Sequence, residues 1–338
     1  MQAFVTGGTG LLGSFLIAEL LKNKAEVTAI HRENSDFKVC KTILSYFFDD
    51  VEQAFSSIRW ESCDVLDFFR LEEIISNEMY VFHCAAFVSF QKNDHEKIKQ
   101  INIEGTKNIV QICLEKKVQK LVHVSSIASL GRGLDGKQTT EEDYWDGSGK
   151  ASVYSKSKFE AEREVWRGIA EGLNAVIVNP SVIIGPGEWT KGSSQLIKTV
   201  AKGLKFYTKG TNGYVDVRDV AKVSYLLAFS EISNQRFILN SENLDYQNLF
   251  GLMAEYLKVK APAICVGRML SEISWRILSI ISFVGRKSPL ITRETARSAI
   301  QKYSYSNEKI RKYLVYEFIP MRECIKFSCE KYLSQMTQ

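Results

Sequence analysis

The sequence has few prolines, five in 338 residues, and no Pro/Ser-rich stretch that would act as a linker. We therefore expect any separate lobes of the chain to be joined intimately. The lysines and arginines are scattered, with no long basic run of the kind that marks a nucleic-acid tail, and the net charge of +5 is only mildly basic. No nucleic-acid partner is predicted.

Patterns that would hold a metal are also missing. The four histidines show no metal-type spacing, and the seven cysteines include no Cys-x-x-Cys pair. Most of the cysteines sit within apolar runs, which predicts reduced, buried thiols in a cytoplasmic protein. We expect no metal site.

Apolar runs long enough to cross a bilayer are not found either. The run at residues 277–284 is too short, because a span needs about 20 apolar residues. Trp275, Arg276 and Arg286 around it leave open an interfacial membrane contact, beside a helix that packs between lobes or in a dimer. Residues 2–6 already have the pattern of a core strand, so no signal peptide is expected.

What the chain does have is a regular alternation of apolar strands and helices. The strands read as nearly continuous apolar runs, which is typical of a parallel sheet covered on both faces. We expect an α/β fold, a doubly wound parallel Rossmann sheet with a smaller, mostly helical C-terminal substrate lobe. The NAD(P)-binding domain would take residues 1–180, continued by about 213–240, and the substrate-binding lobe residues 181–212 and 241–338.

The expected elements can be given by residue ranges. Strands are predicted at residues 2–6, 26–30, 58–63, 80–86, 118–124, 175–179 and 237–239. Helices are predicted at residues 11–22, 67–76, 94–115 and 193–205, with an inserted helical segment at 37–57. Residues 214–221 read as a short strand turning into a capped helix.

A glycine-rich turn follows the first strand at once. Gly7, Gly10 and Gly13 lie between that strand and a helix, which is the context a dinucleotide fingerprint requires. The first glycine allows the tight turn, the second lets the backbone approach a pyrophosphate, and the third lets the helix pack closely on the strand. The spacing is Gly-x-x-Gly-x-x-Gly, unlike the more familiar Gly-x-Gly-x-x-Gly.

The second strand ends at His31 and Arg32, without the acid that NAD-binding sheets usually carry there. A guanidinium suits a ribose 2′-phosphate through bidentate, charge-assisted contacts. This favours NADP(H) over NAD(H). The alternative is that Arg32 is a surface residue and that the cofactor is NAD.

Tyr154 stands four residues ahead of Lys158 on a predicted helix, so the phenol and the ammonium share one face. A neighbouring cation favours the phenolate and lowers the pKa of a tyrosine, which would let it exchange a proton with an alcohol or a carbonyl. Ser125 and Ser126 follow the fifth strand. His83, by contrast, lies inside an apolar run and is interpreted as a satisfied core histidine.

Together these blocks resemble the extended short-chain dehydrogenases/reductases, over nearly the whole chain. The glycine turn, Asp64 at a strand end, the serine pair and the Tyr154/Lys158 pair each match that family. The Ser126–Ser129 turn and the pattern over residues 289–314 are most similar to the dihydroflavonol-4-reductase and 3β-hydroxysteroid dehydrogenase branch. Extended members are often dimers, so the resemblance also implies a possible homodimer.

The resemblance implies roles for individual residues. Tyr154 would be the general acid-base, Lys158 would assist it and bond the nicotinamide ribose, and Ser126 would bond the reacting oxygen, with Ser125 as its rival. The residues expected to hold the cofactor lie mostly at strand ends, with a few on helices: Gly7, Thr9, Gly10, Leu11, Leu12, Gly13, His31, Arg32, Asp64, Val65, Ala85, Ala86, Asn102, Ser125, Tyr154, Lys158, Asn179 and Pro180.

Two departures from the family narrow the expected reaction. Sugar-nucleotide dehydratases carry an Asp-Glu pair where this chain has Ile127 and Ala128, so elimination of water is disfavoured. Arg32 argues for an exchanging NADP(H), hence for net reduction of a ketone or aldehyde. An NAD-dependent nucleotide-sugar epimerase and a non-catalytic NAD(P)-sensing protein are the alternatives. The identity of the small-molecule substrate has no transferable code in the sequence.

Overall fold

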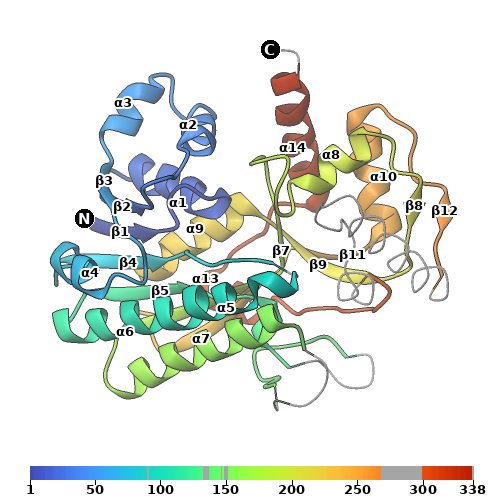
Figure 1. Ribbon diagram of the computed structural model, residues 1–338. Helices are drawn as coiled ribbons and strands as arrows, with labels where there is room; N and C mark the ends of the chain where they lie inside the picture. Colours follow the sequence, from blue (N-terminus) through green and yellow to red (C-terminus); the bar gives the residue numbers. More distant parts are fainter. Residues whose placement is uncertain (90, 132–136, 146, 148–150, 268–298, 337–338) are drawn as a thin grey trace.

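A parallel sheet of seven strands forms the centre of the molecule, in the order β10-β6-β5-β4-β1-β2-β3 (Figure 1). The computed structural model describes residues 1–338 except 90, 132–136, 146, 148–150, 268–298 and 337–338. The strands are β1 Gln2–Thr6, β2 Glu26–His31, β3 Arg59–Ser62, β4 Met79–His83, β5 Lys120–Val124, β6 Ala175–Pro180 and β10 Gln235–Leu239. The predicted doubly wound Rossmann sheet is confirmed.

The strand order reverses beside β1, which pairs with β2 on one side and with β4 on the other. The loops that follow β1 and β4 therefore leave the sheet in opposite directions and open a crevice at its carboxyl edge. In open α/β sheets, ligands bind at this kind of topological switch point. The glycine turn follows β1 directly, so it lies at this crevice.

Helices cover both faces of the sheet because its strands are apolar on both sides. One face is covered by α1 Leu11–Lys22, α2 Lys38–Leu44, α3 Val51–Ser56 and α9 Val217–Ala228. The other face is covered by α4 Phe68–Ile74, α5 His95–Lys99, α6 Gly105–Lys116 and α7 Val153–Ala170. Two apolar cores result, one on each side of the sheet. The seven cysteines are free thiols and five of them are buried, as expected.

The helix expected at residues 94–115 is instead divided in three. A π-helical turn, η2 Gln100–Glu104, separates α5 from α6. Gly105 lies at this junction against Val65, where a β-carbon would come within 2.7 Å of Val65 Cγ2. The close approach of the two segments accounts for a glycine there. Single π-turns inside helices are frequent at functional sites.

The strand expected at 80–86 also ends earlier, at His83. The backbone N–H of Ala85 donates to the Thr6 hydroxyl oxygen at 3.0 Å instead of to a neighbouring strand. Residues 84–86 therefore form a loop that bends over the end of β1. This loop brings Ala85 and Ala86 to the crevice.

A second lobe is built on a small sheet, in the order β11-β9-β7. Its strands are β7 Val182–Ile184, β9 Thr211–Asp216 and β11 Glu242–Asp245, beside a short pair formed by β8 Phe206–Tyr207 and β12 Ile264–Cys265. Its helices are α8 Gln195–Ala201, α10 Tyr246–Leu257 and α14 Met321–Met336, which share a third core. The apolar run at 277–284 lies outside the described residues.

The C-terminal part of the chain returns to the Rossmann sheet. The backbone of Thr139 exchanges hydrogen bonds with Ser304 and Ser306, at 2.8 and 2.9 Å. Thr211 exchanges similar bonds with residues 301 and 303. Helix α13 Glu308–Leu314 then packs against the edge strand β10. Ile310 of this helix is fully buried in the same core as Phe237 and Leu239 of β10.

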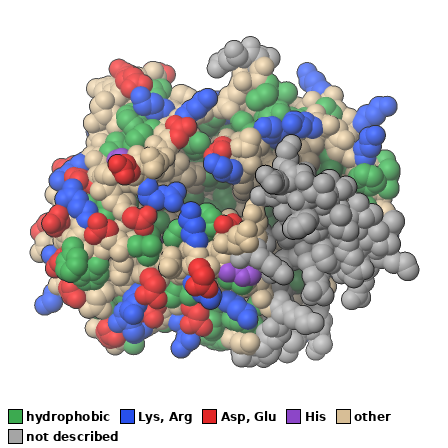
Figure 2. Space-filling model, in the orientation of Figure 1, with side chains coloured by type: hydrophobic (Ala, Val, Ile, Leu, Met, Phe, Trp, Pro, Cys, Tyr) green, Lys and Arg blue, Asp and Glu red, His purple; other side chains and the backbone are tan. Residues whose placement is uncertain are grey.

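The face of the Rossmann half drawn in Figure 2 carries charges of both signs. In Figure 2, lysines and arginines are interspersed there with aspartates and glutamates. Within the described residues, no helix is both long enough and apolar enough to cross a membrane.

Candidate active site

The turn after β1 is shaped to let a ligand approach the backbone. Gly7 has a φ of +70°, and its carbonyl oxygen accepts from the Gly10 N–H at 3.0 Å. A β-carbon on Gly7 would lie 2.9 Å from the backbone nitrogen of Ala85, so only glycine fits against the loop after β4. Helix α1 begins directly after Gly10, without an acidic side chain in its first turn. Its positive end suits an anionic group such as a pyrophosphate.

A cavity of about 540 Å³ lies at the carboxyl ends of β2 and β3. Arg32 and Asp64, both expected to contact the cofactor, line it. Asp64 is held by the Leu66 N–H, which donates to its carboxylate at 3.0 Å. Glu33 also lines the cavity. Sequence reasoning missed this acid because it stands beyond the end of the strand.

His31 and Val65 support this cavity more than they line it. The His31 ring packs edge-on against Phe37 and Trp60, and its Nδ1 contacts the Arg32 carbonyl oxygen at 3.0 Å. Val65 is buried against Gly105. The residues of the turn and the cavity fit the two ends of a dinucleotide: backbone N–H groups for the phosphates and polar side chains for the adenosine.

Tyr154 lies in the first turn of α7 and faces the loop after β5. Ser152 caps this helix by accepting from the Ser155 N–H at 2.9 Å, which fixes where the helix begins. The Tyr154 side chain is hydrogen-bonded to Ser126. Burial raises the pKa of Tyr154, and the bond to Ser126 offsets part of that rise. The lowered pKa expected from the sequence is therefore not observed, since desolvation of the phenolate outweighs the other influences.

Lys158 lies one helical turn further along α7 and is only 2% exposed. Its Nζ donates to the carbonyl oxygen of Val124, the last residue of β5, at 2.8 Å. Burial lowers the pKa of Lys158 to about 8, against the opposing influence of Glu162 and Cys84. The helix spacing thus delivers a phenol and a buried ammonium to one side of α7, as the sequence predicts.

Ser125 and Ser126 are neighbours in the chain but have different partners. The Ser126 hydroxyl oxygen accepts from the Ala128 N–H at 3.1 Å and is bonded to Tyr154. The Ser125 hydroxyl is buried and donates to Glu162 Oε2 at 2.6 Å. The structure therefore brings Ser126, and not Ser125, to the phenol.

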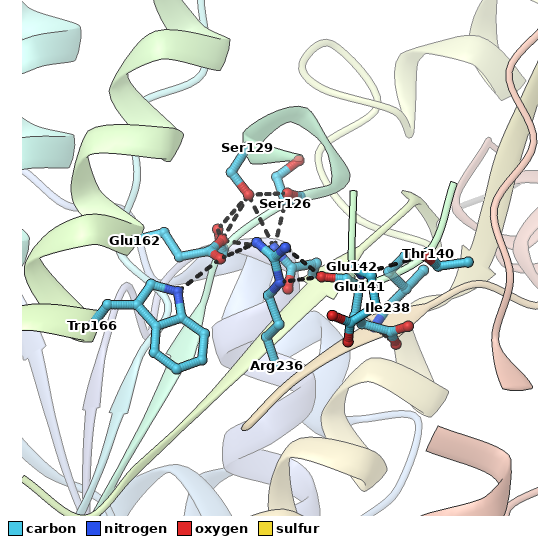
Figure 3. A network of polar contacts seen from close by, with 11 residues as sticks. Ser126, Ser129, Thr140, Glu141, Glu142, Glu162, Trp166, Arg236 and Ile238 are labelled. Atoms are coloured by element: carbon cyan, nitrogen blue, oxygen red, sulfur yellow. Dashed lines mark hydrogen bonds and ion pairs between the residues drawn. The ribbon is translucent and has the colours of Figure 1, made fainter. Parts of the chain in front are cut away.

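Glu162 is a residue that sequence reasoning missed. It lies on α7 four residues after Lys158 and is 3% exposed. Figure 3 shows its carboxylate in the middle of a polar network, with Ser129, Trp166 and Arg236 directed at it. The sequence signal was available, because a charged residue here interrupts the buried stripe of the helix.

Asn102 and Asn179 were expected to contact the cofactor, but most of their amide atoms already have partners, and only the buried Asn179 Oδ1 has none among the described residues. Asn102 accepts from the Phe87 N–H at 2.7 Å and donates to the Phe87 carbonyl and to Ser157. Asn179 donates to the Ser126 carbonyl at 3.2 Å and to Glu162 at 2.8 Å. Both side chains hold the loops of the site, so direct cofactor contacts of their amides stay predictions. Pro180 follows Asn179 at the end of β6.

The histidines in the sheet belong to the core. His83 is fully buried and contacts the hydroxyl oxygens of Thr6 and Thr106, at 2.8 and 3.0 Å. Burial, followed by the charge of Lys158, lowers the pKa of His83 to about 3. The same causes hold the pKa of His123 well below its ordinary value. The interpretation of His83 as a satisfied core histidine is confirmed.

The second lobe contacts the start of α1 and the segment after α2. Leu11 lies beneath Gly185 and Gly187, where a β-carbon on Gly187 would come within 2.9 Å of Leu11 Cδ1. Gln335 of α14 accepts from the Trp189 indole at 2.6 Å and donates to the Tyr46 hydroxyl at 2.9 Å. The inserted segment that contains α2 is thus tied to the substrate lobe across the crevice.

Comparison with known proteins identifies this arrangement. Residues 3–237 match the model of the NAD dependent epimerase/dehydratase family, about two thirds of the chain. The chain belongs to the NAD-dependent epimerase/dehydratase family. Within it, the protein is an extended short-chain dehydrogenase/reductase and an oxidoreductase enzyme.

Its relatives include named reductases. A Synechocystis protein provisionally named a dihydroflavonol 4-reductase is 28% identical over 90% of this chain and 87% of its own length. Cinnamoyl-CoA reductase 1 of Petunia hybrida is 24% identical over 95% of this chain and 89% of its own. The expected resemblance to the dihydroflavonol-4-reductase branch is confirmed.

Solved structures share the whole fold. The crystal structure of gox2253 superposes with a TM-score of 0.82 at 26% identity, covering 98% of both chains. The UDP-glucose 4-epimerase of Thermus thermophilus, in complex with NAD, gives a TM-score of 0.74 at 20% identity over 98% of this chain and 99% of the other. A nicotinamide cofactor and a small-molecule substrate follow from the family, whereas reductase and epimerase share one fold.

Proposed function

We propose that the protein is an NADP(H)-dependent reductase that converts a ketone or aldehyde into an alcohol, with Ser126, Tyr154 and Lys158 at the reacting carbonyl. The observation that carries this proposal is the hydrogen bond between Tyr154 and Ser126, one helical turn from the buried Lys158. Two hydroxyl donors that converge on one point can both bond a single carbonyl oxygen.

Ser126 and Tyr154 would have different roles in the reduction. The Ser126 hydroxyl would donate to the carbonyl oxygen and stabilise the charge that develops on it. The Tyr154 phenol would give its proton to the same oxygen, and a raised pKa keeps this phenol protonated at neutral pH. When bound, the nicotinamide supplies the hydride that completes the alcohol.

Lys158 would serve this proton transfer as a buried cation. With a pKa of about 8 it is mostly protonated at neutral pH, and its positive charge stabilises the phenolate that remains after Tyr154 has given up its proton. The bond to the Val124 carbonyl holds the ammonium in place. Glu162 and Cys84 favour its charged form.

The choice of NADP(H) rests on the cavity at the end of β2. Arg32 lines it and would pair with a 2′-phosphate, as sequence reasoning predicts. The choice of net reduction is supported by the named reductases among the relatives and by Ile127 and Ala128, which supply no second acid-base.

The test is a panel of carbonyl compounds and nucleotide sugars, incubated with purified protein and either NADPH or NADH. We expect oxidation of NADPH in the presence of ketones or aldehydes. The Tyr154→Phe variant should lose about 10²- to 10⁴-fold in kcat, the usual worth of a general acid, with cofactor affinity unchanged. Turnover retained by Tyr154→Phe would contradict the mechanism. Protein that carries one equivalent of NAD, released only on denaturation, and that interconverts nucleotide sugars would instead be an epimerase.

A further inference from the structure

Glu162 has an unusual number of polar partners for a residue that touches neither the crevice nor the solvent. Its Oε2 accepts from the Ser125 hydroxyl at 2.6 Å, from the Ser129 hydroxyl at 2.7 Å and from the Asn179 amide at 2.8 Å. Its Oε1 accepts from Arg236 at 3.1 Å and from Trp166 at 3.3 Å. A buried carboxylate is stable only when it is paired and hydrogen-bonded, and this one is both.

The partners of Glu162 come from the elements that carry the candidate site. Ser125 and Ser129 stand on either side of Ser126, at the start and end of the turn after β5. Asn179 immediately precedes Pro180 at the end of β6, and it also donates to the Ser126 carbonyl. Glu162 itself shares α7 with Tyr154 and Lys158. One carboxylate therefore joins three elements behind the reacting groups.

Arg236 supplies the countercharge from β10. Its Nε donates to the Glu141 carbonyl at 2.8 Å, and its Nη2 donates to the same oxygen. Glu141 in turn accepts from the Ile238 N–H at 2.8 Å. Figure 3 shows Arg236 between the carboxylate of Glu162 and the segment that contains Glu141. The pair thus extends the network to the loop that follows Ser126.

We propose that Glu162 is a positioning residue of the active site, whose carboxylate holds the turn that carries Ser126 against the helix that carries Tyr154. It touches no reacting atom and acts through Ser125, Ser129 and Asn179. This inference rests on the proposed function, because positioning matters only where Ser126 and Tyr154 share a substrate oxygen.

The charge of Glu162 has a second effect, on Lys158. The groups that face this ammonium are His83 and Cys84 from the end of β4, His123 from β5 and Glu162 from α7. Burial keeps the two histidines and the thiol uncharged near neutrality, with the pKa of Cys84 raised to about 12. Among these groups Glu162 is the one that favours the charged form of Lys158 most strongly.

The test compares Glu162→Gln with a matched change on the same helix. Glu160→Gln also removes one carboxylate from α7, but that side chain is 43% exposed and pairs only with Arg163 among the described contacts. We expect Glu162→Gln to lower kcat by about 10- to 100-fold, the size of effect that follows a small misplacement of reacting groups. Affinity for the cofactor should stay unchanged, and Glu160→Gln should match the wild type in both.

The pH profile separates positioning from folding. Without the negative charge of Glu162, Lys158 loses its proton at lower pH, so the alkaline limb of kcat should move to lower pH. A purely structural defect would lower the whole profile without moving that limb. Unchanged positions of the limb in Glu162→Gln would overturn the electrostatic part of the proposal.

Removal of Glu162 alone also leaves Arg236 as an unpaired buried charge, which is strongly destabilising. The double variant Glu162→Gln with Arg236→Gln removes both charges and should recover thermal stability relative to the single variant. We expect it to keep the reduced kcat and the shifted limb. A double variant that regains wild-type kcat would overturn the positioning role, because only the unpaired arginine would then have been harmful.

A titration without cofactor or substrate keeps the inference separate from the proposed function. The absorbance of tyrosinate, taken as the difference between each protein and its Tyr154→Phe counterpart, reports Tyr154 alone. In Glu162→Gln this signal should move to higher pH, because the Ser126 hydrogen bond that favours the phenolate is weakened. An unmoved signal would overturn the positioning role even in a protein with measured reductase activity. Absence of that activity in the wild type would overturn the proposed function instead.

Discussion

Gly13 approaches Gly7 so closely that a β-carbon on Gly13 would lie 2.1 Å from the Gly7 carbonyl oxygen. That oxygen already accepts the N–H of Gly10, so it cannot move without opening the turn. The first turn of α1 and the end of β1 are therefore in contact through backbone atoms alone. This contact places the N-terminus of the helix at the crevice.

The first prediction concerns Gly13→Ala. The added methyl group overlaps backbone and not a mobile side chain, so the turn must shift. We expect a loss of about 1–3 kcal/mol in the free energy of unfolding, as in other overpacked sites, and at least 10-fold weaker binding of NADPH. Urea unfolding and a fluorescence titration would measure these changes.

Gly251→Ala is the control for that variant. Gly251 lies in α10, where nothing approaches the position of its β-carbon within 4 Å. Alanine in a helix is favoured over glycine by up to about 1 kcal/mol, so this variant should be at least as stable as the wild type. Wild-type binding of NADPH by Gly13→Ala would contradict the shape that we assign to the turn.

The second prediction concerns cofactor choice. Arg32→Ala should weaken NADPH binding by about 10- to 100-fold, the worth of a charge-assisted contact, and leave NADH binding nearly unchanged. Glu33→Gln should strengthen NADPH binding, because this acid lines the same cavity and repels a phosphate. Arg59→Ala, which removes a 71% exposed arginine at the far end of β3, serves as the control. If Arg32→Ala keeps the wild-type preference, the assignment to NADP(H) is wrong.

The third prediction concerns the stability of the protein at acidic pH. Burial lowers the folded-state pKa of His83 from 6.5 to about 3, so below pH 6.5 the unfolded chain binds more protons than the folded one. The stability contributed by the neutral imidazole is present above pH 6.5 and is lost as the pH falls toward 3. Through His83 alone, the free energy of unfolding should fall by about 2 kcal/mol between pH 6.5 and pH 5.

His83→Gln tests this dependence, because a glutamine can still bond Thr6 and Thr106 but does not titrate. Urea midpoints measured across that pH range should fall less steeply in the variant than in the wild type. His95→Gln, a change on α5 outside the sheet, should retain the wild-type slope. Equal slopes for His83→Gln and the wild type would contradict the assignment of acid sensitivity to this core histidine.

The fourth prediction concerns Lys120, which begins β5 and is 4% exposed. Its Nζ donates to the carbonyl oxygens of Leu227 and Ile232, at 3.3 and 3.0 Å, and also to that of Ser230. The ammonium thus satisfies the C-terminal end of α9. Lys120→Met should lower the free energy of unfolding by about 1–3 kcal/mol, because buried carbonyl groups lose their hydrogen-bond donor.

Guanidine or urea unfolding would measure this cost. Lys116→Met removes a lysine that is paired with Glu72 at the surface, 3.7 Å away, and should change stability by less than about 1 kcal/mol. A Lys120→Met variant as stable as Lys116→Met would show that water can replace the ammonium at the helix end.

Much of the fold could be predicted because local patterns determine it. The apolar runs before the glycine turn and at residues 175–179 are buried strands, and helical periodicity identified α1. The π-turn at Gln100–Glu104 had no comparable signal. It ends at a tertiary contact between Gly105 and Val65, which lie forty positions apart and cannot be paired by local rules.

The candidate site was only partly predictable for the same reason. The spacing of Tyr154 and Lys158 is local, and it placed both groups correctly on one side of a helix. The choice between Ser125 and Ser126 depends on Glu162, whose partner Arg236 comes from a distant strand. Opposite charges at two positions expected to be buried could have suggested the pair. That three separate elements meet at the Glu162 carboxylate could not have been inferred from the sequence.

The return of the C-terminal residues to the Rossmann half also constrains how the protein is made. Strands β1 to β4 can assemble as they emerge from the ribosome, since all their partners in the sheet precede Ala175. Thr139 receives its backbone partners from residues beyond 299, and β10, which pairs with β6, also receives the helix α13 from there, after all seven strands of the sheet in the chain. A chain that stalls or is cut shortly before residue 299 would therefore leave β10 without the packing of α13 and the loop after Ser126 without its backbone partners.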